Sequence, residues 1–223
     1  GLLLTEGMHG MISQVEGLAK GLDIDFIHEK IELNNFWKLF PPKFTPVSSF
    51  VFKNKIEKNF DIIISCGRKS IIPSIYLKKK FKNKVMNIHI QDPKVSLNNF
   101  DYIIAPEHDG LIGKNVLVTK GAIHYITEDD LIKNQSYLKP KINKEKVVAM
   151  IVGGPNKYYD FNDNIIENIF LNVQNDFIDK GYQLIFIPSI RTPKNIIEKA
   201  VNFFNEKKLI IKNIDKKAYL SSM

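Results

Sequence analysis

The chain has 223 residues, of which 44% are hydrophobic and 25% are charged, with a formal net charge of +8. These proportions are typical of a soluble globular protein, and no apolar run approaches the roughly 18–20 residues that cross a membrane. A single cysteine excludes an internal disulfide framework and favours a reducing compartment. The first ten residues are too short for a signal peptide and lack its basic flank. We therefore expect a cytoplasmic protein without an integral membrane segment.

The positive charge raises the question of a nucleic-acid partner. Basic runs occur at residues 76–84 and 205–217. Aromatic residues are not interleaved with them as a base-stacking platform requires. We interpret these runs as solvated helix faces and turns, and expect no nucleic-acid partner.

The first part of the chain alternates short apolar runs with helical periods. The runs are apolar throughout rather than alternating, which predicts strands buried on both faces of a parallel sheet. Helices are predicted at 11–22 and 70–81, with a short turn at 107–113, whereas three prolines make 40–46 a loop. Strands are predicted at 1–5, 23–28, 61–65, 85–90, 101–105 and 115–119. The alternation indicates an α/β fold with right-handed crossovers.

The pattern restarts near residue 146. Predicted strands at 146–154, 182–189 and 208–212 alternate with helices at 159–181 and 193–207, the first of them closed by Gly181. A stretch rich in lysine and proline precedes this restart, so we predict domains at 1–138 and 146–223 joined by a linker at 139–145. Three strands make a thin core for a domain. The second domain is therefore expected to be incomplete.

Ligands of open parallel sheets bind at the carboxyl ends of the strands, so the loops there are the candidate sites. In or beside these loops lie both arginines of the chain, Arg68 and Arg191, and four of its five histidines. An arginine in a chain that otherwise uses lysine suggests planar, bidentate binding of phosphate or carboxylate. His89, inside a predicted strand, and Cys66 are interpreted as core residues.

The loop "SCGRKS" at 65–70 has two interpretations that the sequence leaves open. Gly67 permits close backbone approach and the helix N-terminus offers free N–H groups, as in a phosphate-binding turn. Alternatively, Ser70 caps the helix and Arg68 is a surface residue. The GxxxxGK[ST] spacing of a Walker A loop is missing.

Three further loops carry candidate residues. Gly153 and Gly154 follow a strand and precede a helix, without the spacing of a nicotinamide-type fingerprint. His9 and Gly10 stand before the first helix. Glu107 and His108 are either acidic and polar residues of a first helical turn or a general base with its neighbour, and the two interpretations have equal weight.

The motifs "GMHGMISQVEGLAKGL", "SCGRKSIIPSIYLKK", "HIQDPK" and "PEHDG" followed by "NVLVTKGAIH" and "IVGGPNKYYDF" stand in the same order in one known family. Over most of residues 1–161 the chain resembles the mitochondrial fission (elongated-mitochondria) proteins of bacteria and plants, also described as predicted nucleoside-diphosphate-sugar epimerases. The resemblance implies a GT-B fold of two Rossmann-like domains. Family members continue beyond this chain's end with a further strand and motif, in a region where GT-B proteins commonly hold a nucleotide sugar.

The resemblance and the loop positions together imply a protein that binds a nucleotide-diphosphate sugar, acting as a glycosyltransferase without a metal or another cofactor. Glu107 or His108 is the expected catalytic base. An unknown acceptor is expected near His9, Gly10, Arg68 and His124, and the donor phosphates near Gly153, Gly154, Asn156 and Arg191. A nucleotide-sugar epimerase and a non-enzymatic interaction protein with a protein partner are the alternatives.

Overall fold

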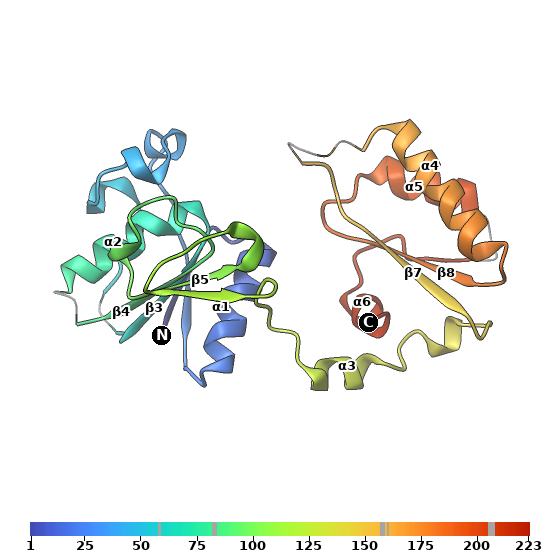
Figure 1. Cartoon of the computed structure of the whole chain (residues 1–223), viewed down its shortest axis with the longest axis horizontal. Coiled ribbons are helices and arrows are strands. Elements are labelled where there is room, and N and C mark those ends of the chain that lie inside the picture. The colour runs from blue at the N-terminus through green and yellow to red at the C-terminus, as the bar shows by residue number, and fades with distance from the viewer. Residues whose placement is uncertain (58, 82–83, 157–158, 160, 205–207) are drawn as a thin grey trace. The chain divides into compact units, whose positions relative to one another are not determined.

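The computed structural model describes residues 1–223 except 58, 82–83, 157–158, 160 and 205–207 (Figure 1). The contacts within the chain divide it into two compact units, Gly1–Ile126 and Thr127–Met223. Each unit contains its own parallel β-sheet. The predicted α/β class with two Rossmann-like domains is thus confirmed.

The sheet of the first unit has the strand order β2-β1-β3-β4-β5-β6, and every pairing is parallel. The chain runs outward from β1 to β2 and then returns to the other side of β1, so the order reverses between β1 and β3. The described α-helices of the unit are α1 (His9–Gly21) and α2 (Ile71–Lys80). The strands are β1 (Leu2–Thr5), β2 (Ile27–Lys30), β3 (Ile62–Cys66), β4 (Met86–Ile90), β5 (Tyr102–Pro106) and β6 (Val116–Thr119).

Both faces of this sheet are buried, which explains the continuous apolar runs. Successive side chains of a strand point to opposite faces. Leu2 and Leu4 of β1 pack in one core cluster with Ile71 and Ile75 of α2. Leu3, between them, belongs to a second cluster with residues of α1 such as Val15.

The second unit has a sheet in the order β7-β8-β9, again parallel. One face carries a phenylalanine-rich core that includes Phe170, Phe186 and Phe204, and the other carries Leu138, Ile185, Ile187 and Ala218. Its strands are β7 (Val147–Val152), β8 (Gln183–Pro188) and β9 (Leu209–Ile210). Its helices are α3 (Glu128–Asn134), α4 (Asp163–Val173, followed by a π-helical turn Gln174–Ile178), α5 (Lys194–Phe204) and α6 (Lys216–Ser221).

The sequence missed helix α3. It begins with a capping box, in which the Thr127 side chain accepts from the backbone N–H of Asp130 and the Asp130 side chain accepts from the backbone N–H of Thr127. This threonine-to-acid spacing and the acidic first turn are recognised start signals, so the helix could have been predicted from the sequence.

The division into units differs from the predicted domains 1–138 and 146–223. Leu138 is 1% exposed in the core of the second unit, and the Tyr137 hydroxyl donates to Asp215 at 3.0 Å. Residues 139–141 form a 3₁₀ turn between Leu138 and the partly buried Ile142. The lysines and proline of the predicted linker 139–145 thus mark an exposed turn within the unit.

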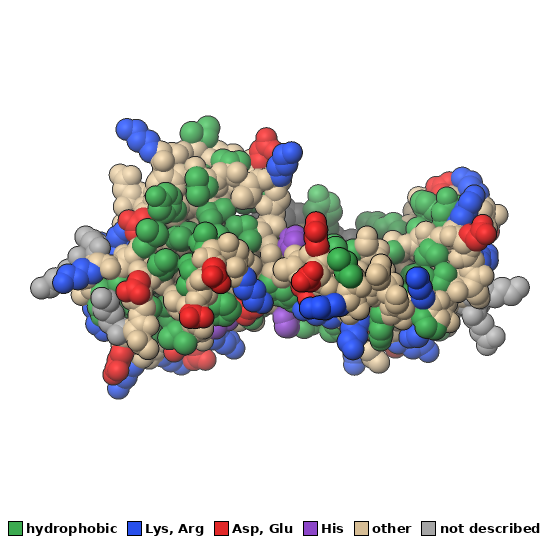
Figure 2. Space-filling view, turned by 90° about the horizontal axis from the view of Figure 1, so that it is seen from below, with side chains coloured by type: hydrophobic (Ala, Val, Ile, Leu, Met, Phe, Trp, Pro, Cys, Tyr) green, Lys and Arg blue, Asp and Glu red, His purple; other side chains and the backbone are tan. Residues whose placement is uncertain are grey.

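The positive charge is dispersed. On the face of the molecule shown in Figure 2, lysine and arginine side chains alternate with acidic ones and form no continuous stripe in either unit. Within the described ranges, no helix combines the length and the apolar character needed to cross a bilayer.

Candidate functional site

The carboxyl ends of β1 and β3 lie side by side at the point where the strand order of the first unit reverses. Such switch points are where open parallel sheets place their ligands. Gly7 follows β1 with φ of 84°, and Gly67 follows β3 with φ of 92°. Both loops therefore use backbone conformations that favour glycine.

A carboxylate of the chain itself occupies the start of the helical segment after β3. Glu6 Oε1 accepts from the Lys69 backbone N–H at 3.0 Å, and Glu6 Oε2 lies 2.7 Å from Lys69 Nζ. Ser70 occupies the N-cap position of α2, but its side chain does not cap the helix, because its hydroxyl donates to the Gly67 carbonyl at 2.8 Å. The anion-binding position that the sequence suggested in this turn is thus held by Glu6.

The loop after β4 has an unusual backbone. Gln91 has φ of 83° and Lys94 has φ of 54°, and among the described non-glycine residues only Asp23 also has a positive φ. Such conformations cost free energy outside glycine and cluster at functional sites. The loop closes a cavity of about 270 Å³, which is lined by Pro41, Pro42, Gly67, Arg68, Ile71, His89, Gln91, Asp92, Pro93 and Lys94.

His89 is a buried polar side chain in the wall of this cavity. It is 1% exposed, and its Nδ1 lies 2.9 Å from the Ser65 hydroxyl. Because that hydroxyl donates to the Ile88 carbonyl, His89 Nδ1 is assigned as the donor to Ser65. Burial lowers the pKa of His89 to about 3, against an opposing effect of Asp92. The ring is therefore neutral at physiological pH, and its Nε2 is a hydrogen-bond acceptor with no bond to any described residue.

Three charged residues line the same cavity: Arg68, and Asp92 in an ion pair with Lys94. The Arg68 guanidinium is exposed and donates to the Lys38 carbonyl at 2.8 Å, which fixes its direction. Burial raises the pKa of Asp92, but hydrogen bonds from the Lys94 backbone and ammonium outweigh it and lower that pKa overall. The cavity thus combines a cation, an anion and a neutral acceptor, a set suited to a polar ligand with hydroxyl groups.

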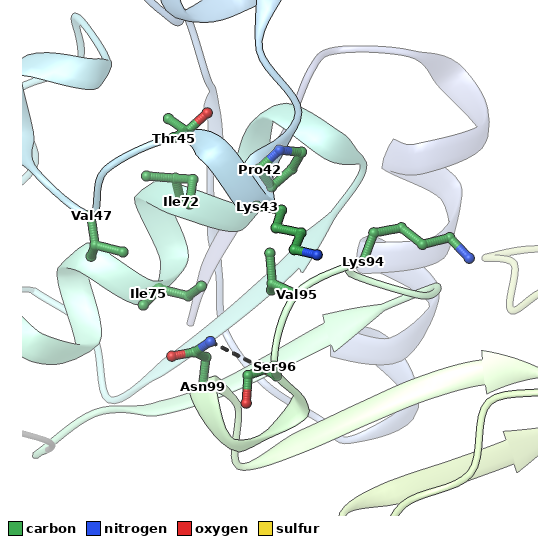
Figure 3. A pocket seen from close by; sticks show the side chains of 10 residues that line it. All are labelled: Pro42, Lys43, Thr45, Val47, Ile72, Ile75, Lys94, Val95, Ser96 and Asn99. Atoms are coloured by element: carbon green, nitrogen blue, oxygen red, sulfur yellow. Dashed lines mark hydrogen bonds between the residues drawn. The ribbon is translucent and has the colours of Figure 1, made fainter.

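A second cavity, of about 480 Å³, adjoins the first through Pro42 and Lys94. Figure 3 shows its apolar floor on α2, formed by Ile72 and Ile75, with Val95 opposite them on the loop after β4. The Lys94 side chain extends away from the other lining residues in this view. Together the two cavities follow the carboxyl ends of β3 and β4.

The structure brings His9, Gly10, Glu107 and His108 to the same edge, but not into these cavities, and places His124 against the middle of α1. His9 and Gly10 begin α1 and are exposed. Glu107 and His108 form an exposed 3₁₀ turn directly after β5, next to the β4 loop in the sheet order. The His124 carbonyl packs on Gly17 of α1, where an added Cβ would lie 2.5 Å from it.

In the second unit, two predicted residues meet. Gly154 packs so closely on the loop after β8 that a Cβ there would lie 2.1 Å from the carbonyl oxygen of Arg191. That loop is fixed by Thr192, whose hydroxyl donates to the Val152 carbonyl at 2.6 Å. The Arg191 side chain is exposed and makes no ion pair or hydrogen bond with the residues that the structure describes. The backbone and Cβ of Arg191 are thus held against the two-glycine turn, and its guanidinium is exposed to solvent.

Gly153 and Asn156, the other residues predicted near the donor phosphates, differ in their surroundings. Gly153 has open space where a Cβ would stand. Asn156 shapes the next turn, in which its side chain accepts from the Tyr159 N–H at 3.0 Å. Lys157, a further cation that could neutralise a diphosphate at this turn, and Tyr158 lie outside the described residues.

The family model described as "Mitochondrial fission ELM1" matches residues 9–222. The chain belongs to this family. A curated relative, the uncharacterized protein RP120 of Rickettsia prowazekii (strain Madrid E), is 28% identical over 47% of this chain and 38% of that protein. The chain therefore matches well under half of that relative's length.

The fold of this ELM1-family chain also has a counterpart among solved structures. The UDP-GlcNAc 2-epimerase from Methanocaldococcus jannaschii matches with a TM-score of 0.55, covering 99% of this chain and 74% of the epimerase. The two sequences are 14% identical, so the likeness shows the fold alone. It agrees with the GT-B-like architecture that the sequence implied.

Sequence reasoning on this ELM1-family member missed the cavity residues His89, Gln91, Asp92 and Lys94. The motif "HIQDPK" follows the predicted strand 85–90, but the sequence alone predicts a core role for His89. Only one of its ring nitrogens is hydrogen-bonded to a described residue. The positive φ angles at Gln91 and Lys94 have no sequence signal, because neither residue type favours them.

The low pKa of His89 predicts a specific acid sensitivity. The unfolded chain protonates this ring near its ordinary pKa of about 6.5, whereas the folded ring stays neutral down to about pH 3. Above pH 6.5, His89 therefore does not lower the free energy of unfolding. Below that pH the free energy of unfolding falls, by about 2 kcal/mol at pH 5. His89→Gln should remove this part of the loss.

Urea unfolding followed through Trp37, the single tryptophan, measures the effect in the first unit. His28 also has a lowered pKa through burial, but it is present in both proteins and cancels in the comparison. Equal losses of stability between pH 7 and pH 5 in wild type and variant would contradict the prediction.

Proposed function

We propose that the chain binds a nucleoside-diphosphate sugar through its second unit and transfers the sugar to an acceptor held by its first. The contact between Gly154 and Arg191 carries the proposal: a glycine turn after one strand meets the arginine after the next, leaving a guanidinium without a described partner. Arginine binds phosphate oxygens in a bidentate manner, and glycine allows the diphosphate close to the backbone.

The acceptor side of the proposal rests on the cavity after β3 and β4. Neutral His89 would accept a hydrogen bond from an acceptor hydroxyl, and Arg68 would bind an anionic group of the same molecule. With so low a pKa, His89 is a poor general base, so the proton acceptor is assigned to Glu107 or His108 on the neighbouring turn.

In the proposed reaction the acceptor oxygen forms a bond to the anomeric carbon of the sugar. The bond from that carbon to the diphosphate breaks, and the nucleoside diphosphate leaves with the electron pair. The acceptor proton passes to Glu107 or His108. Arg191 offsets the charge that develops on the leaving group, a role that needs no metal.

Isothermal titration calorimetry of the chain with UDP- and GDP-sugars tests donor binding. We expect at least one donor to bind, Arg191→Ala to weaken its binding about tenfold or more, and Arg191→Lys to fall between. Lys180→Ala, an exposed cation of the same unit, is the matched control and should bind as wild type does. Absence of binding across a broad panel that includes free UDP and GDP would overturn the proposal.

The epimerase alternative draws on the solved structure that shares the fold. It predicts inversion at C2 of the bound sugar without any acceptor, which incubation with candidate sugars and analysis of the product would detect. The non-enzymatic alternative predicts a stable protein partner and full cellular function of an Arg68→Ala variant.

A further inference from the structure

Residues 36–50 of the first unit, here called the aromatic segment, expose an unusual amount of apolar surface. Leu39 is 80% exposed and Phe44 is 68% exposed. The same segment exposes Phe36, Phe40, Val47 and Phe50. Contiguous apolar surface of this kind marks an interaction site in a folded protein.

The exposed rings form a cluster rather than isolated side chains. The half-buried Trp37 lies at its centre, with ring centroids 4.9 Å from Phe36, 5.8 Å from Phe40 and 5.9 Å from Phe50. Leu39 and Phe44 extend the cluster on either side of Phe40 in the chain. Both side chains are thus exposed within a few residues of the ring cluster in the chain.

The exposure does not come from a lack of structure. The segment runs through three 3₁₀ turns, Trp37–Leu39, Pro42–Phe44 and Ser49–Val51. Val51 is fully buried in the main core, and the Lys38 carbonyl accepts from Arg68 at 2.8 Å. In Figure 1 the segment, in lighter blue, stands out from the sheet of its unit. A fixed backbone thus holds these apolar side chains outward.

The charged residues from Leu33 to Ile56 have a single sign, and only at the boundary of this stretch does an acidic residue, Glu32, pair with Lys53 at 4.0 Å. No aspartate or glutamate occurs between Leu33 and Ile56. The same stretch contains four lysines, Lys38, Lys43, Lys53 and Lys55. The stretch is therefore basic as well as apolar.

We propose that the aromatic segment binds the surface of an anionic phospholipid bilayer. Leu39 and Phe44 would enter the acyl region, the ring cluster would lie at the headgroup level, and the lysines would face the lipid phosphates. This combination of aromatic rings, aliphatic side chains and lysines matches a surface that is apolar inside and negatively charged outside. An acidic protein partner would match the lysines but not the separately protruding side chains.

Trp37 gives a direct readout, because it is the single tryptophan of the chain and lies within the segment. We expect the chain to co-float with vesicles of phosphatidylcholine containing 30% phosphatidylglycerol, with a blue shift of Trp37 emission. Binding to pure phosphatidylcholine vesicles should be at least about tenfold weaker, and added salt should weaken the binding to anionic vesicles.

Paired variants test whether vesicle binding depends on the aromatic segment or on exposed apolar side chains in general. The double variant Leu39→Ser, Phe44→Ser should bind anionic vesicles about tenfold or more weakly, while its circular dichroism and unfolding stay as in wild type, since both side chains are mostly exposed. Ile112→Ser, which removes a 91% exposed isoleucine elsewhere in the unit, should bind as wild type does.

Three results would overturn the proposal. They are the absence of vesicle binding at low salt, binding that the double variant retains in full, and equal binding to neutral and anionic vesicles. If no vesicles bind and a purified acidic protein instead shifts Trp37 emission, the segment is a protein-docking surface. These readouts do not depend on nucleotide-sugar binding, so they stand or fall separately from the proposed function.

Discussion

Gly154→Ala should destabilise the second unit by roughly 3–4 kcal/mol. The added Cβ would lie 2.1 Å from the Arg191 carbonyl oxygen and 2.6 Å from the Arg191 Cβ, far inside van der Waals contact. Because the nearest atom is backbone, held by the hydrogen bonds of Ser189 and Thr192 to Val152, no side-chain rotation relieves the clash. The two loops must separate, which also moves Arg191.

Hydrogen–deuterium exchange of the β8 amides measures this effect locally. A loss of about 3 kcal/mol in the free energy of opening corresponds to exchange on the order of 100-fold faster where reclosing is faster than the chemical exchange. The adjacent substitution Gly153→Ala is the matched control, because nothing lies within 4 Å of its added Cβ. Similar exchange rates in the two variants would show that the loops do not meet as described.

Gly67→Ala should destabilise the first unit by roughly 2–4 kcal/mol. Gly67 has φ of 92° and ψ of 157°, a region that side-chain-bearing residues essentially avoid. Its Cβ would also meet Met11 Sδ at 2.5 Å and Glu6 Oε1 at 3.4 Å. Met11 is flexible and gives way in part, so most of the cost comes from the backbone.

Urea unfolding followed by Trp37 fluorescence measures the loss at Gly67. Gly110→Ala is its control, since Gly110 has φ of 62° in the left-handed helical region and open space around its Cβ. We expect it to cost only about 1 kcal/mol. If Gly110→Ala lowers the free energy of unfolding more than Gly67→Ala does, steric contact and backbone conformation do not determine the loss of stability at Gly67.

The sequence predicted the fold well because the sheets are built from continuous apolar runs. Strands such as Leu2–Thr5 and Gln183–Pro188 are buried along their whole length, so hydrophobicity marks them directly. The β2 strand, at Ile27–Lys30, lies later than predicted because it is an edge strand with exposed residues at both ends. The β2 strand therefore lacks the continuous apolar run that marks the buried strands in the sequence.

The candidate site was predictable in place but not in detail. Strand ends can be read from the sequence, and they led to Arg68, Gly154 and Arg191. The hydrogen bonding of the His89 ring depends on Ser65, a residue of another strand. The two residues lie side by side only because of the register in which β3 pairs with β4. Tertiary neighbours determine the pKa of a buried histidine and which of its ring nitrogens is hydrogen-bonded. The pattern of a single sequence does not contain this information.

The bond between Glu6 and Lys69 has a consequence for selectivity at the β1–β3 edge. A carboxylate tethered to the same fold behaves as an intramolecular competitor, present at a high effective concentration beside the Lys69 N–H. A free inorganic anion at ordinary concentrations competes poorly against it. Only a ligand with additional contacts along the neighbouring cavity gains enough to displace or bypass Glu6, so this edge discriminates by the size of the whole ligand rather than by its charge.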